Sequence, residues 1–300
     1  MDNEQPIDQM RVLVTGAAGM LGSQIMLGVP DGADAVGTDL RAAPGVEAVG
    51  TDLTDAAQVA ELFEKHGPFT GVIHSAAYTA VDRAEADEPL ALAVNRDACE
   101  VLAQACKAAD IPLVAVGTDF VFDGSKRTPY TVDDSPNPLS AYGRTKLAGE
   151  EAARAVHPTG TRIVRTQWLY GPRGKHFPAT MQQLARERDS LRVVADQIGS
   201  PTSTLELAPA LWDVLAKGEA GVYHAACEGS CSWYDLAVAT LEYAGLEGTT
   251  VEPCGTEDYP TPAVRPAYTV LDCSRLTALR GAPLADWRDA LKTYLGNGDQ

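Results

Sequence analysis

The chain has 300 residues, of which 45% are hydrophobic and 22% charged, a balance typical of a globular protein that argues against disorder over the whole length. Its formal net charge of −17 argues against nucleic acid and anionic membranes as partners, because both select basic surfaces. The six cysteines form no C-x-x-C pair and no apolar run is long enough to span a membrane, so we expect reduced thiols, no metal site and a cytoplasmic protein.

The chain opens on a polar, acidic stretch that lacks a signal peptide's pattern, so residues 1–9 are predicted to be a disordered tail. After it, β-branched runs alternate with apolar positions at helical spacing. Strands are predicted at 11–15, 34–38, 46–50, 71–75, 112–117 and 161–165, and helices at 20–28, 55–66, 89–109 and from the N-cap Ser140 onward. This alternation predicts an α/β fold of the Rossmann type, with a doubly wound parallel sheet.

The C-terminal part has shorter elements and a turn-like stretch at 256–266. No long linker precedes it. We therefore expect residues 10–170 to form a dinucleotide-binding domain that carries the catalytic residues. Residues 171–300 are expected to form mainly a smaller substrate-binding lobe, packed on the sheet and interleaved with the first domain.

Three glycines, Gly16, Gly19 and Gly22, follow the first predicted strand and open the first helix. Glycine allows a tight turn and a close approach of the backbone to a pyrophosphate, and the helix N-terminus supplies free N–H groups. The strand before and the helix after make this pattern far more specific than a glycine triplet alone. It predicts a nicotinamide dinucleotide site that includes Met20 and Leu21.

An acidic residue, Asp39, lies 23 positions past Gly16 at the end of the second predicted strand. A carboxylate there binds the adenosine ribose and disfavours a 2′-phosphate, whereas Arg41 could offset that repulsion. The choice between NADH and NADPH therefore stays open. Asp52 and Leu53 fit an adenine-contacting position, although Asp52 fits equally well as the cap of the next helix.

A Y-x-x-x-K pattern places Tyr142 and Lys146 on one face of the helix after Ser140. A nearby ammonium is expected to lower the pKa of the phenol, which otherwise titrates near 10. Tyr142 could then give a proton to the alkoxide formed when hydride reaches a carbonyl carbon. Thr118 ends the fifth predicted strand, where its hydroxyl could polarise that carbonyl.

These features resemble the extended short-chain dehydrogenases/reductases. Further segments resemble the dTDP-4-dehydrorhamnose reductase family, with a likeness that runs from about residue 11 to 290. The segments are AAYTAVDRAE (76–85), TDFVFDG (118–124), PLSAYGRTKLAGE (138–150), RTQWLYG (165–171), DQIGSPT (196–202), GVYHAA (221–226) and YPTPAVRP (259–266). The resemblance implies reduction, with NADPH or NADH, of the 4-keto group of a dTDP-6-deoxyhexulose, giving dTDP-L-rhamnose.

The resemblance also implies site residues. Trp168 suits a sugar or thymine face but also a protein core, and Arg265 suits a diphosphate but also a surface ion pair. Phosphate could also meet residues just after RTQWLYG. The implied positions are Ala76, Ala77 and Tyr78 beside the nicotinamide, Val81, Thr118, Asp119, Phe120, Trp168 and Arg265 beside the substrate, and Arg173, Lys175 and His176 for phosphate.

At two positions the sequence differs from motifs of related families, and these differences narrow the expected reaction and oligomeric state. Sugar-nucleotide dehydratases carry T-D-E where this chain has Phe120, which argues for simple reduction. Gln24 stands where some reductases have a glutamate that joins a magnesium-linked dimer, so we expect no metal and either a monomer or a homodimer. Two alternatives stay open: a 4-ketoreductase of another nucleotide deoxysugar, or a non-catalytic regulatory subunit resembling that of methionine adenosyltransferase.

Overall fold

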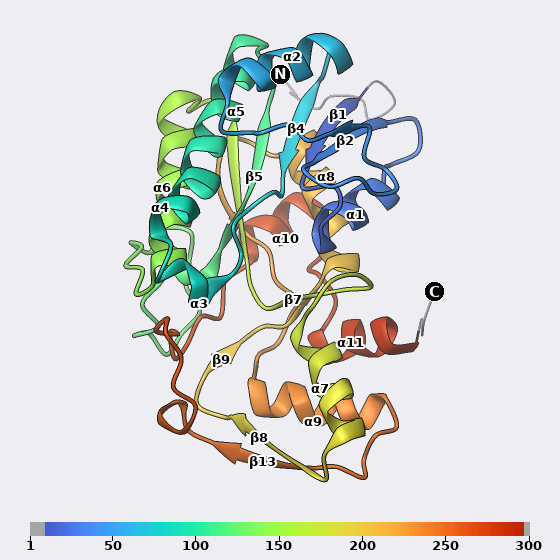
Figure 1. Cartoon of the computed structure of the whole chain (residues 1–300), viewed down its shortest axis with the longest axis vertical. Helices are drawn as coiled ribbons and strands as arrows, with labels where there is room; N and C mark the ends of the chain where they lie inside the picture. Colours follow the sequence, from blue (N-terminus) through green and yellow to red (C-terminus); the bar gives the residue numbers. More distant parts are fainter. Residues whose placement is uncertain (1–9, 297–300) are drawn as a thin grey trace.

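The computed structural model describes residues 10–296, so the tail predicted at 1–9 and the last four residues lie outside the described part. Its centre is a seven-stranded parallel sheet in the order β11-β6-β5-β4-β1-β2-β3, which confirms the predicted α/β fold (Figure 1). The first six strands follow the Rossmann order 3-2-1-4-5-6, with one more strand added at the β6 edge. The strands are β1 (Arg11–Thr15), β2 (Asp34–Asp39), β3 (Ala48–Val49), β4 (Gly71–His74), β5 (Leu113–Thr118), β6 (Thr161–Thr166) and β11 (Gly221–His224).

Helices cover both faces of this sheet. On one face lie α2 (Ala56–His66), α5 (Ala98–Ala108) and α6 (Ala141–Val156), and on the other α1 (Met20–Leu27) packs against α8 (Thr204–Lys217). Successive residues of β1 show why helices pack on both faces of the sheet. Val12 and Val14 join the core cluster beneath α1 and α8, whereas Leu13 joins the cluster beneath α2 and α5. The three central residues of the strand are therefore all apolar, because both faces of the strand are buried.

The predicted elements are confirmed with two differences. The strand expected at 46–50 is only Ala48–Val49. The helix expected at 89–109 is interrupted: α4 (Glu88–Leu92) is followed by a π-helical turn at Ala93–Asp97 before α5 begins. Tertiary contacts accompany this turn, where the Asn95 amide bonds the backbone of Tyr78 and the hydroxyl of Thr145. Apolar periodicity along one helix carries no information about such contacts.

Ser140 is the N-cap of α6, as predicted, and its hydroxyl oxygen accepts a hydrogen bond from the N–H of Gly143.

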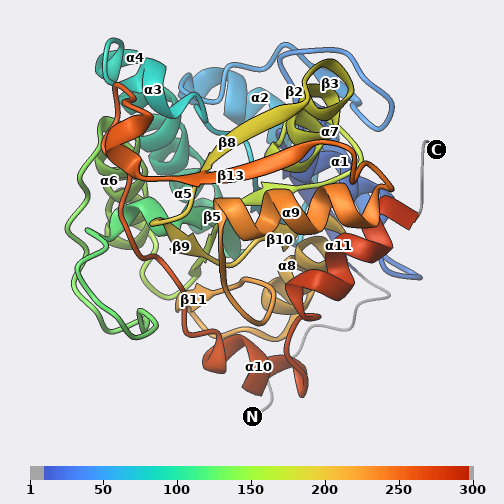
Figure 2. The same ribbon diagram turned by 90° about the horizontal axis from the view of Figure 1, so that it is seen from below.

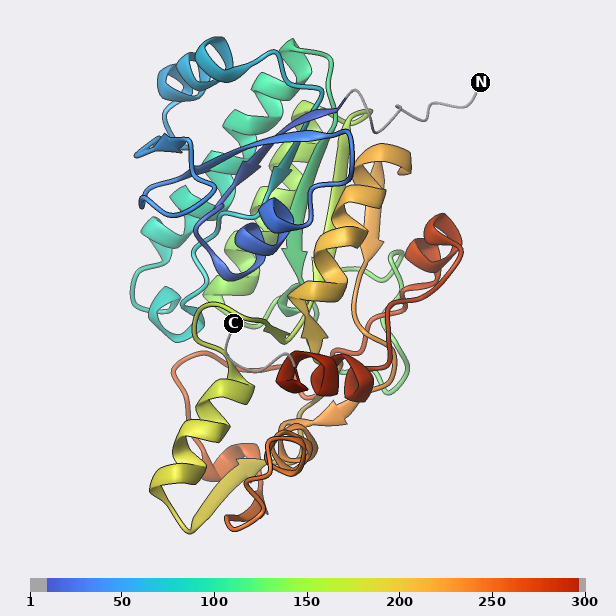
Figure 3. The same ribbon diagram turned by 90° about the vertical axis from the view of Figure 1, so that its right-hand side faces the viewer.

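A smaller lobe lies below the carboxyl ends of the sheet strands (Figure 3). It consists mainly of α7 (Phe177–Glu187), β8 (Ser190–Val194), α9 (Trp233–Tyr243) and β13 (Thr250–Cys254), with β13 paired parallel to β8 (Figure 2). The chain returns to the sheet as α8 and β11 before it builds α9, so the lobe is not a continuous segment. Shorter elements complete the chain: α3 (Val81–Ala84), β7 (Leu169–Tyr170), β9 (Ile198–Gly199), β10 (Thr202–Ser203), β12 (Cys231–Ser232), α10 (Ser274–Arg280) and α11 (Trp287–Gly296).

The described residues 10–296 contain no helix with the length and apolar character that crossing a membrane requires. All six cysteines are free, and four of them are buried. Within the same residues, no cluster of three or more His, Cys, Asp or Glu side chains is arranged to hold a metal ion.

Candidate active site

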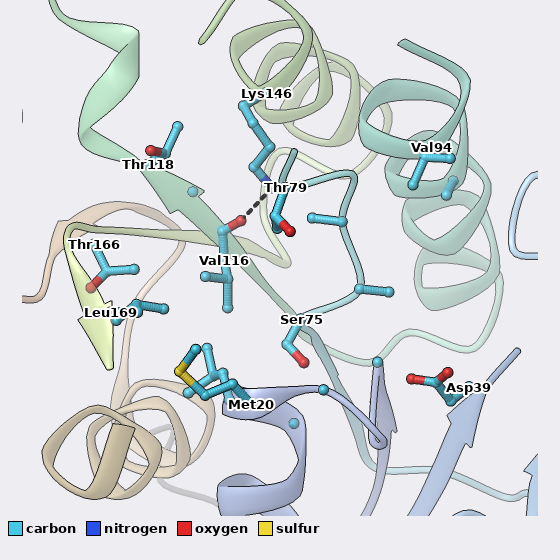
Figure 4. A pocket seen from close by; sticks show the side chains of 18 of the residues that line it. Met20, Asp39, Ser75, Thr79, Val94, Val116, Thr118, Lys146, Thr166 and Leu169 are labelled. Carbon is cyan, nitrogen blue, oxygen red and sulfur yellow. Dashed lines mark hydrogen bonds between the residues drawn. The ribbon is translucent and has the colours of Figure 1, made fainter. Parts of the chain in front are cut away.

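A cavity of about 700 Å³, the first cavity, opens at the carboxyl ends of β1, β2, β4 and β5 (Figure 4). Its floor is the glycine loop. Gly16 has a φ of +70°, and a Cβ on Gly22 would lie 2.0 Å from the Gly16 carbonyl oxygen. Only glycine fits at these two positions, because the loop packs tightly on itself and on the backbone after β4.

The Asp39 carboxylate lies at the edge of the first cavity and is held by the backbone. One oxygen accepts the N–H of Ala18 at 3.1 Å and the other accepts the N–H of Arg41 at 3.0 Å. The Asp39 side chain is 11% exposed, whereas the Arg41 side chain is 73% exposed, with Nε 3.6 Å from the carboxylate. The backbone therefore fixes the acid, whereas the base lies mostly in solvent at the edge of the pair.

Asp52 and Leu53 also line the first cavity. Asp52 accepts from the N–H and hydroxyl of Thr54, so it stabilises its own turn. The N-cap of α2 is instead Asp55, which accepts the N–H of Ala57 at 2.8 Å. The alternative interpretation of Asp52 as the helix cap is therefore wrong, because the helix starts three residues later.

Three polar side chains from two elements meet at one wall of the first cavity. Thr118 ends β5, and Tyr142 and Lys146 lie one turn apart on α6. Lys146 is only 8% exposed, and its Nζ donates to the Val116 carbonyl at 2.7 Å, the dashed line in Figure 4. Tyr142 packs edge-on against Phe120, with 5.5 Å between ring centroids.

The electrostatics of this wall differ from the sequence expectation. Burial raises the pKa of Tyr142 to about 12, although a hydrogen bond with Thr118 opposes the shift. Burial also lowers the pKa of Lys146, against the opposing charges of Cys99 and Glu150. The lowered phenol pKa expected from the ammonium is therefore wrong for the chain alone, because burial and the nearby carboxyl groups of Asp119 and Glu150 raise the pKa. Tyr142 holds its proton at neutral pH and is available as an acid.

Asp119 lies between this wall and the smaller lobe, and it is 2% exposed. One of its oxygens accepts the Thr118 hydroxyl at 3.1 Å. Burial raises the pKa of Asp119 to about 7, and hydrogen bonds with Thr269 and Thr118 limit the rise. Near neutral pH this carboxyl is therefore present in both the neutral and the charged form.

A second cavity of about 730 Å³ lies within the smaller lobe, and it shares Asp119, Phe120 and Trp168 with the first. Trp168 has a φ of +47°, rare for a tryptophan, and its ring stacks on Trp233 with 3.5 Å between centroids. Such backbone strain persists only where neighbours fix it, and it gathers at functional sites. Trp168 packs on the core, as one interpretation expected, and it also lines both cavities, where contact with the substrate stays a prediction.

Three arginines and two aspartates line the second cavity: Arg188, Arg192, Arg265, Asp82 and Asp119. Arg265 forms a two-fold ion pair with Asp82 of α3, with both N–O distances 2.8 Å. Arg192 pairs with Asp258 at 3.0 Å. Arg188 also lines the cavity. A ligand with several negative oxygens would meet three guanidinium groups here.

The structure brings most of the sequence-predicted residues into the two cavities, but not all. Tyr78 and Arg173 line neither. Lys175 lines the first cavity, whereas the His176 ring caps α7 and bonds Tyr294. The residues in the first cavity are Gly16, Gly19, Met20, Leu21, Gly22, Asp39, Arg41, Asp52, Leu53, Ala76, Ala77, Val81, Thr118, Asp119, Phe120, Tyr142, Lys146 and Trp168, and Arg265 lines the second.

Sequence reasoning missed most of the second cavity. Gln197 lies in the DQIGSPT segment, where the motif itself was the available signal, and it accepts the indole N–H of Trp233 at 3.2 Å. Trp233, Arg188 and Arg192 stand in no motif that we recognised. They come together only through the folding of the lobe.

Comparisons with known proteins agree with this geometry. The family described as "RmlD substrate binding domain" matches residues 10–299. A dTDP-4-dehydrorhamnose reductase of Mycolicibacterium smegmatis is 44% identical over 94% of this chain and 84% of its own length. A dTDP-4-keto-6-deoxy-D-glucose reductase of Streptomyces niveus is 37% identical over 94% and 95%. The crystal structure of a dTDP-4-dehydrorhamnose reductase of Bacillus anthracis in complex with NADP has a TM-score of 0.89 at 33% identity, over 96% of this chain and 99% of its own.

Proposed function

The chain belongs to the dTDP-4-dehydrorhamnose reductase family, and from this premise we propose that it reduces the 4-keto group of a dTDP-6-deoxyhexulose to give dTDP-L-rhamnose. It is an NAD(P)H-dependent oxidoreductase. The observation that carries the proposal is the meeting of Thr118, Tyr142 and Lys146 at one wall of a cavity floored by the glycine loop.

The residues of the first cavity fit a nicotinamide dinucleotide. A Cβ on Gly16 would lie 2.7 Å from the Ala76 nitrogen and one on Gly22 would meet the loop itself, so both glycines are needed for the tight turn. This turn leads into the N-terminus of α1, whose free N–H groups would face the pyrophosphate. Asp39 would hold the adenosine ribose, and Asp52 and Leu53 the adenine. Lys146 would hold the nicotinamide ribose, near Ala76 and Ala77. When bound, this group supplies the hydride.

Reduction also needs a proton at the carbonyl oxygen. Tyr142 supplies it, because its raised pKa keeps the phenol protonated and a secondary alkoxide is a stronger base than a phenolate. The Thr118 hydroxyl stabilises charge on the same oxygen. Lys146 keeps a positive charge near the phenolate that remains.

The second cavity supports a nucleotide-sugar substrate. Val81, Asp119 and Phe120 stand near the reacting carbonyl, Trp168 offers a flat face to the sugar or the thymine, and Arg265 meets the diphosphate. Phe120 carries no acid, which supports reduction over dehydration. In this proposal residues 10–170 hold the cofactor and mainly residues 171–300 hold the substrate, in a cytoplasmic monomer or homodimer.

A second candidate keeps the chemistry and changes the sugar. The Streptomyces niveus relative is named for a dTDP-4-keto-6-deoxy-D-glucose, at 37% identity over nearly the whole chain. The residues that choose between such sugars lie in the second cavity, where small changes of contact decide specificity.

The test is oxidation of NADPH and NADH, followed at the nicotinamide absorbance band, with enzymatically generated dTDP-4-dehydro-L-rhamnose. Rapid oxidation supports the reductase, and the ratio of rates gives the cofactor preference. Cofactor binding without oxidation of either nucleotide contradicts the proposed substrate. Oxidation with dTDP-4-keto-6-deoxy-D-glucose in its place supports the second candidate.

A further inference from the structure

The ion pair between Asp82 and Arg265 joins the two parts of the molecule. The residues are 183 positions apart in the sequence. Asp82 lies on α3, beside the sheet, and Arg265 on the segment that follows β13, and Figures 1 and 2 both show these segments side by side. Both residues line the second cavity, and Val81, next to Asp82, lines the first.

The contacts of the Arg265 guanidinium are uneven. Its Nη1 donates toward Asp82 at 2.8 Å, the Thr261 hydroxyl at 2.7 Å and the Ala263 carbonyl at 2.8 Å. Its Nη2 makes one bond, to the other Asp82 oxygen at 2.8 Å. No hydrogen bond from residues 10–296 engages Nε. The side of the guanidinium formed by Nη1 and the first Nη2 hydrogen is therefore fully hydrogen-bonded. The Nε hydrogen and the second Nη2 hydrogen remain as donors without an acceptor among residues 10–296.

Those two remaining donors point along one edge of the guanidinium plane. Such an edge matches two oxygens of a phosphate group, because Arg binds planar pairs of oxygens in a two-fold manner. The Asp82 carboxylate is itself fixed, since the Ala263 N–H donates to it at 3.2 Å. The Arg265 guanidinium beside Asp82 also holds the pKa of that carboxyl below its usual value, so the pair stays ionised at neutral pH.

We propose that Asp82 is a positioning residue that fixes Arg265 so that its free Nε–Nη2 edge receives the diphosphate of a nucleotide sugar. The inference rests on the proposed function for the identity of the ligand. Asp82 acts through Arg265 and does not itself touch the nucleotide. If Asp82 instead competed with the diphosphate for Arg265, its carboxylate would weaken binding, and removing its charge would lower the Kd of dTDP.

The experiment measures the Kd of dTDP by titration calorimetry for the wild type, Asp82→Asn, Arg265→Ala and the double variant. We expect Asp82→Asn to raise the Kd about tenfold, because a guanidinium with a lost partner is no longer preorganised. In the Arg265→Ala background the same change should matter less than about twofold, since contacting residues that act as one unit are not additive. The Kd of NADPH should stay unchanged throughout.

A matched control is available one helix away. Glu88 of α4 and Arg144 of α6 form a similar two-fold pair at 3.0 and 2.9 Å and line neither cavity. The Glu88 side chain is 42% exposed and that of Asp82 is 40% exposed. Glu88→Gln should leave the Kd of dTDP unchanged. Because an exposed ion pair contributes only about 0–1 kcal/mol to stability, both variants should fold. A thermal melt checks this.

In the binding experiment, three results overturn the inference: tighter or unchanged dTDP binding by Asp82→Asn, additive effects in the double variant, or no binding of dTDP by the folded wild type. The proposed function fails separately. A wild type that binds dTDP in the expected pattern but reduces no sugar nucleotide contradicts the reaction and leaves the role of Asp82 intact. Normal turnover with an unchanged KM in Asp82→Asn contradicts only the role of Asp82.

Discussion

The two cavities are built in different ways from the same chain. The first contains many residues at or just after strand ends, such as the glycine loop after β1, Asp39 at the end of β2 and Thr118 at the end of β5. The second is made of side chains from α3, α7, β8, α9 and the segment after β13. The carboxyl ends of parallel strands all lie at one edge of the sheet, so side chains at those ends are brought together by the sheet itself. The side chains of the smaller lobe come from helices and strands that meet only through tertiary packing. We expect changes in the first cavity to alter chemistry and cofactor binding, and changes in the second to alter substrate binding alone.

The largest effect is expected from Tyr142→Phe, which removes the proton donor and keeps the ring. Turnover should fall by about 10²–10⁴-fold, the usual contribution of a general acid. The Kd of the cofactor should stay within about twofold of wild type, since the phenol oxygen contributes little to cofactor affinity next to the whole loop. Single-turnover kinetics together with cofactor fluorescence measures both. Turnover near the wild-type rate would remove Tyr142 from the mechanism.

The next effect tests the glycine loop. A Cβ on Gly22 would lie 2.0 Å from the Gly16 carbonyl oxygen, so Gly22→Ala should displace the loop and weaken cofactor binding by more than about tenfold. Gly248→Ala is the control, because a Cβ there meets nothing within 4 Å. Calorimetric titration with NADPH compares the two. Equal affinities in both variants would contradict the assignment of the loop.

A smaller effect is expected on cofactor choice. Asp39→Asn removes the charge that opposes a 2′-phosphate, so the ratio of kcat/KM for NADPH over NADH should rise about tenfold, equal to roughly 1.4 kcal/mol. Arg41→Ala should move the ratio in the opposite direction, since this exposed base is the nearest cation to Asp39. Steady-state rates with both cofactors decide. A ratio that neither variant alters would place the adenosine ribose elsewhere.

In the second cavity, Trp233→Ala removes the ring on which Trp168 stacks. Trp168 then loses the neighbour that holds its ring in place. At most the pair's energy of about 0.5–1.5 kcal/mol is lost from that positioning, so the KM for the nucleotide sugar should rise roughly two- to tenfold. Both kcat and the Kd of NADPH should stay at their wild-type values, because Trp233 does not line the first cavity. A decrease in kcat with an unchanged KM would contradict the assignment of substrate binding to the second cavity.

Asp119, which belongs to both cavities, is expected to change stability rather than the binding and rate constants compared above. Its pKa is raised by burial from 3.8 to about 7, so between these values the folded state binds more protons than the unfolded state. The free energy of unfolding should therefore fall as the pH rises from about 4 to 7. Asp119→Asn should remove this contribution, so its stability relative to wild type should increase across the same window. Urea unfolding at pH 4, 5, 6, 7 and 8 measures the slope, and parallel curves would contradict it.

Much of the first cavity followed from the sequence because its determinants are local. The spacing of Gly16, Gly19 and Gly22 after a β-branched run fixes a turn, and the i, i+4 spacing of Tyr142 and Lys146 fixes a shared helix face. These relations hold whatever the rest of the chain does. The family resemblance added Trp168 and Arg265, which no local pattern indicates.

What tertiary structure alone decided is the environment of those residues. Desolvation raised the pKa of Tyr142 where the sequence pattern predicted a fall, since burial depends on every segment packed around the ring. The π-helical turn before α5 depends on the contacts of Asn95 with Tyr78 and Thr145. The pairing of Asp82 with Arg265, across 183 positions, depends on how the lobe is seated on the sheet. The sequence thus determined which groups are present and which of them are neighbours along one element, whereas distance, burial and charge between elements arose only when the chain folded.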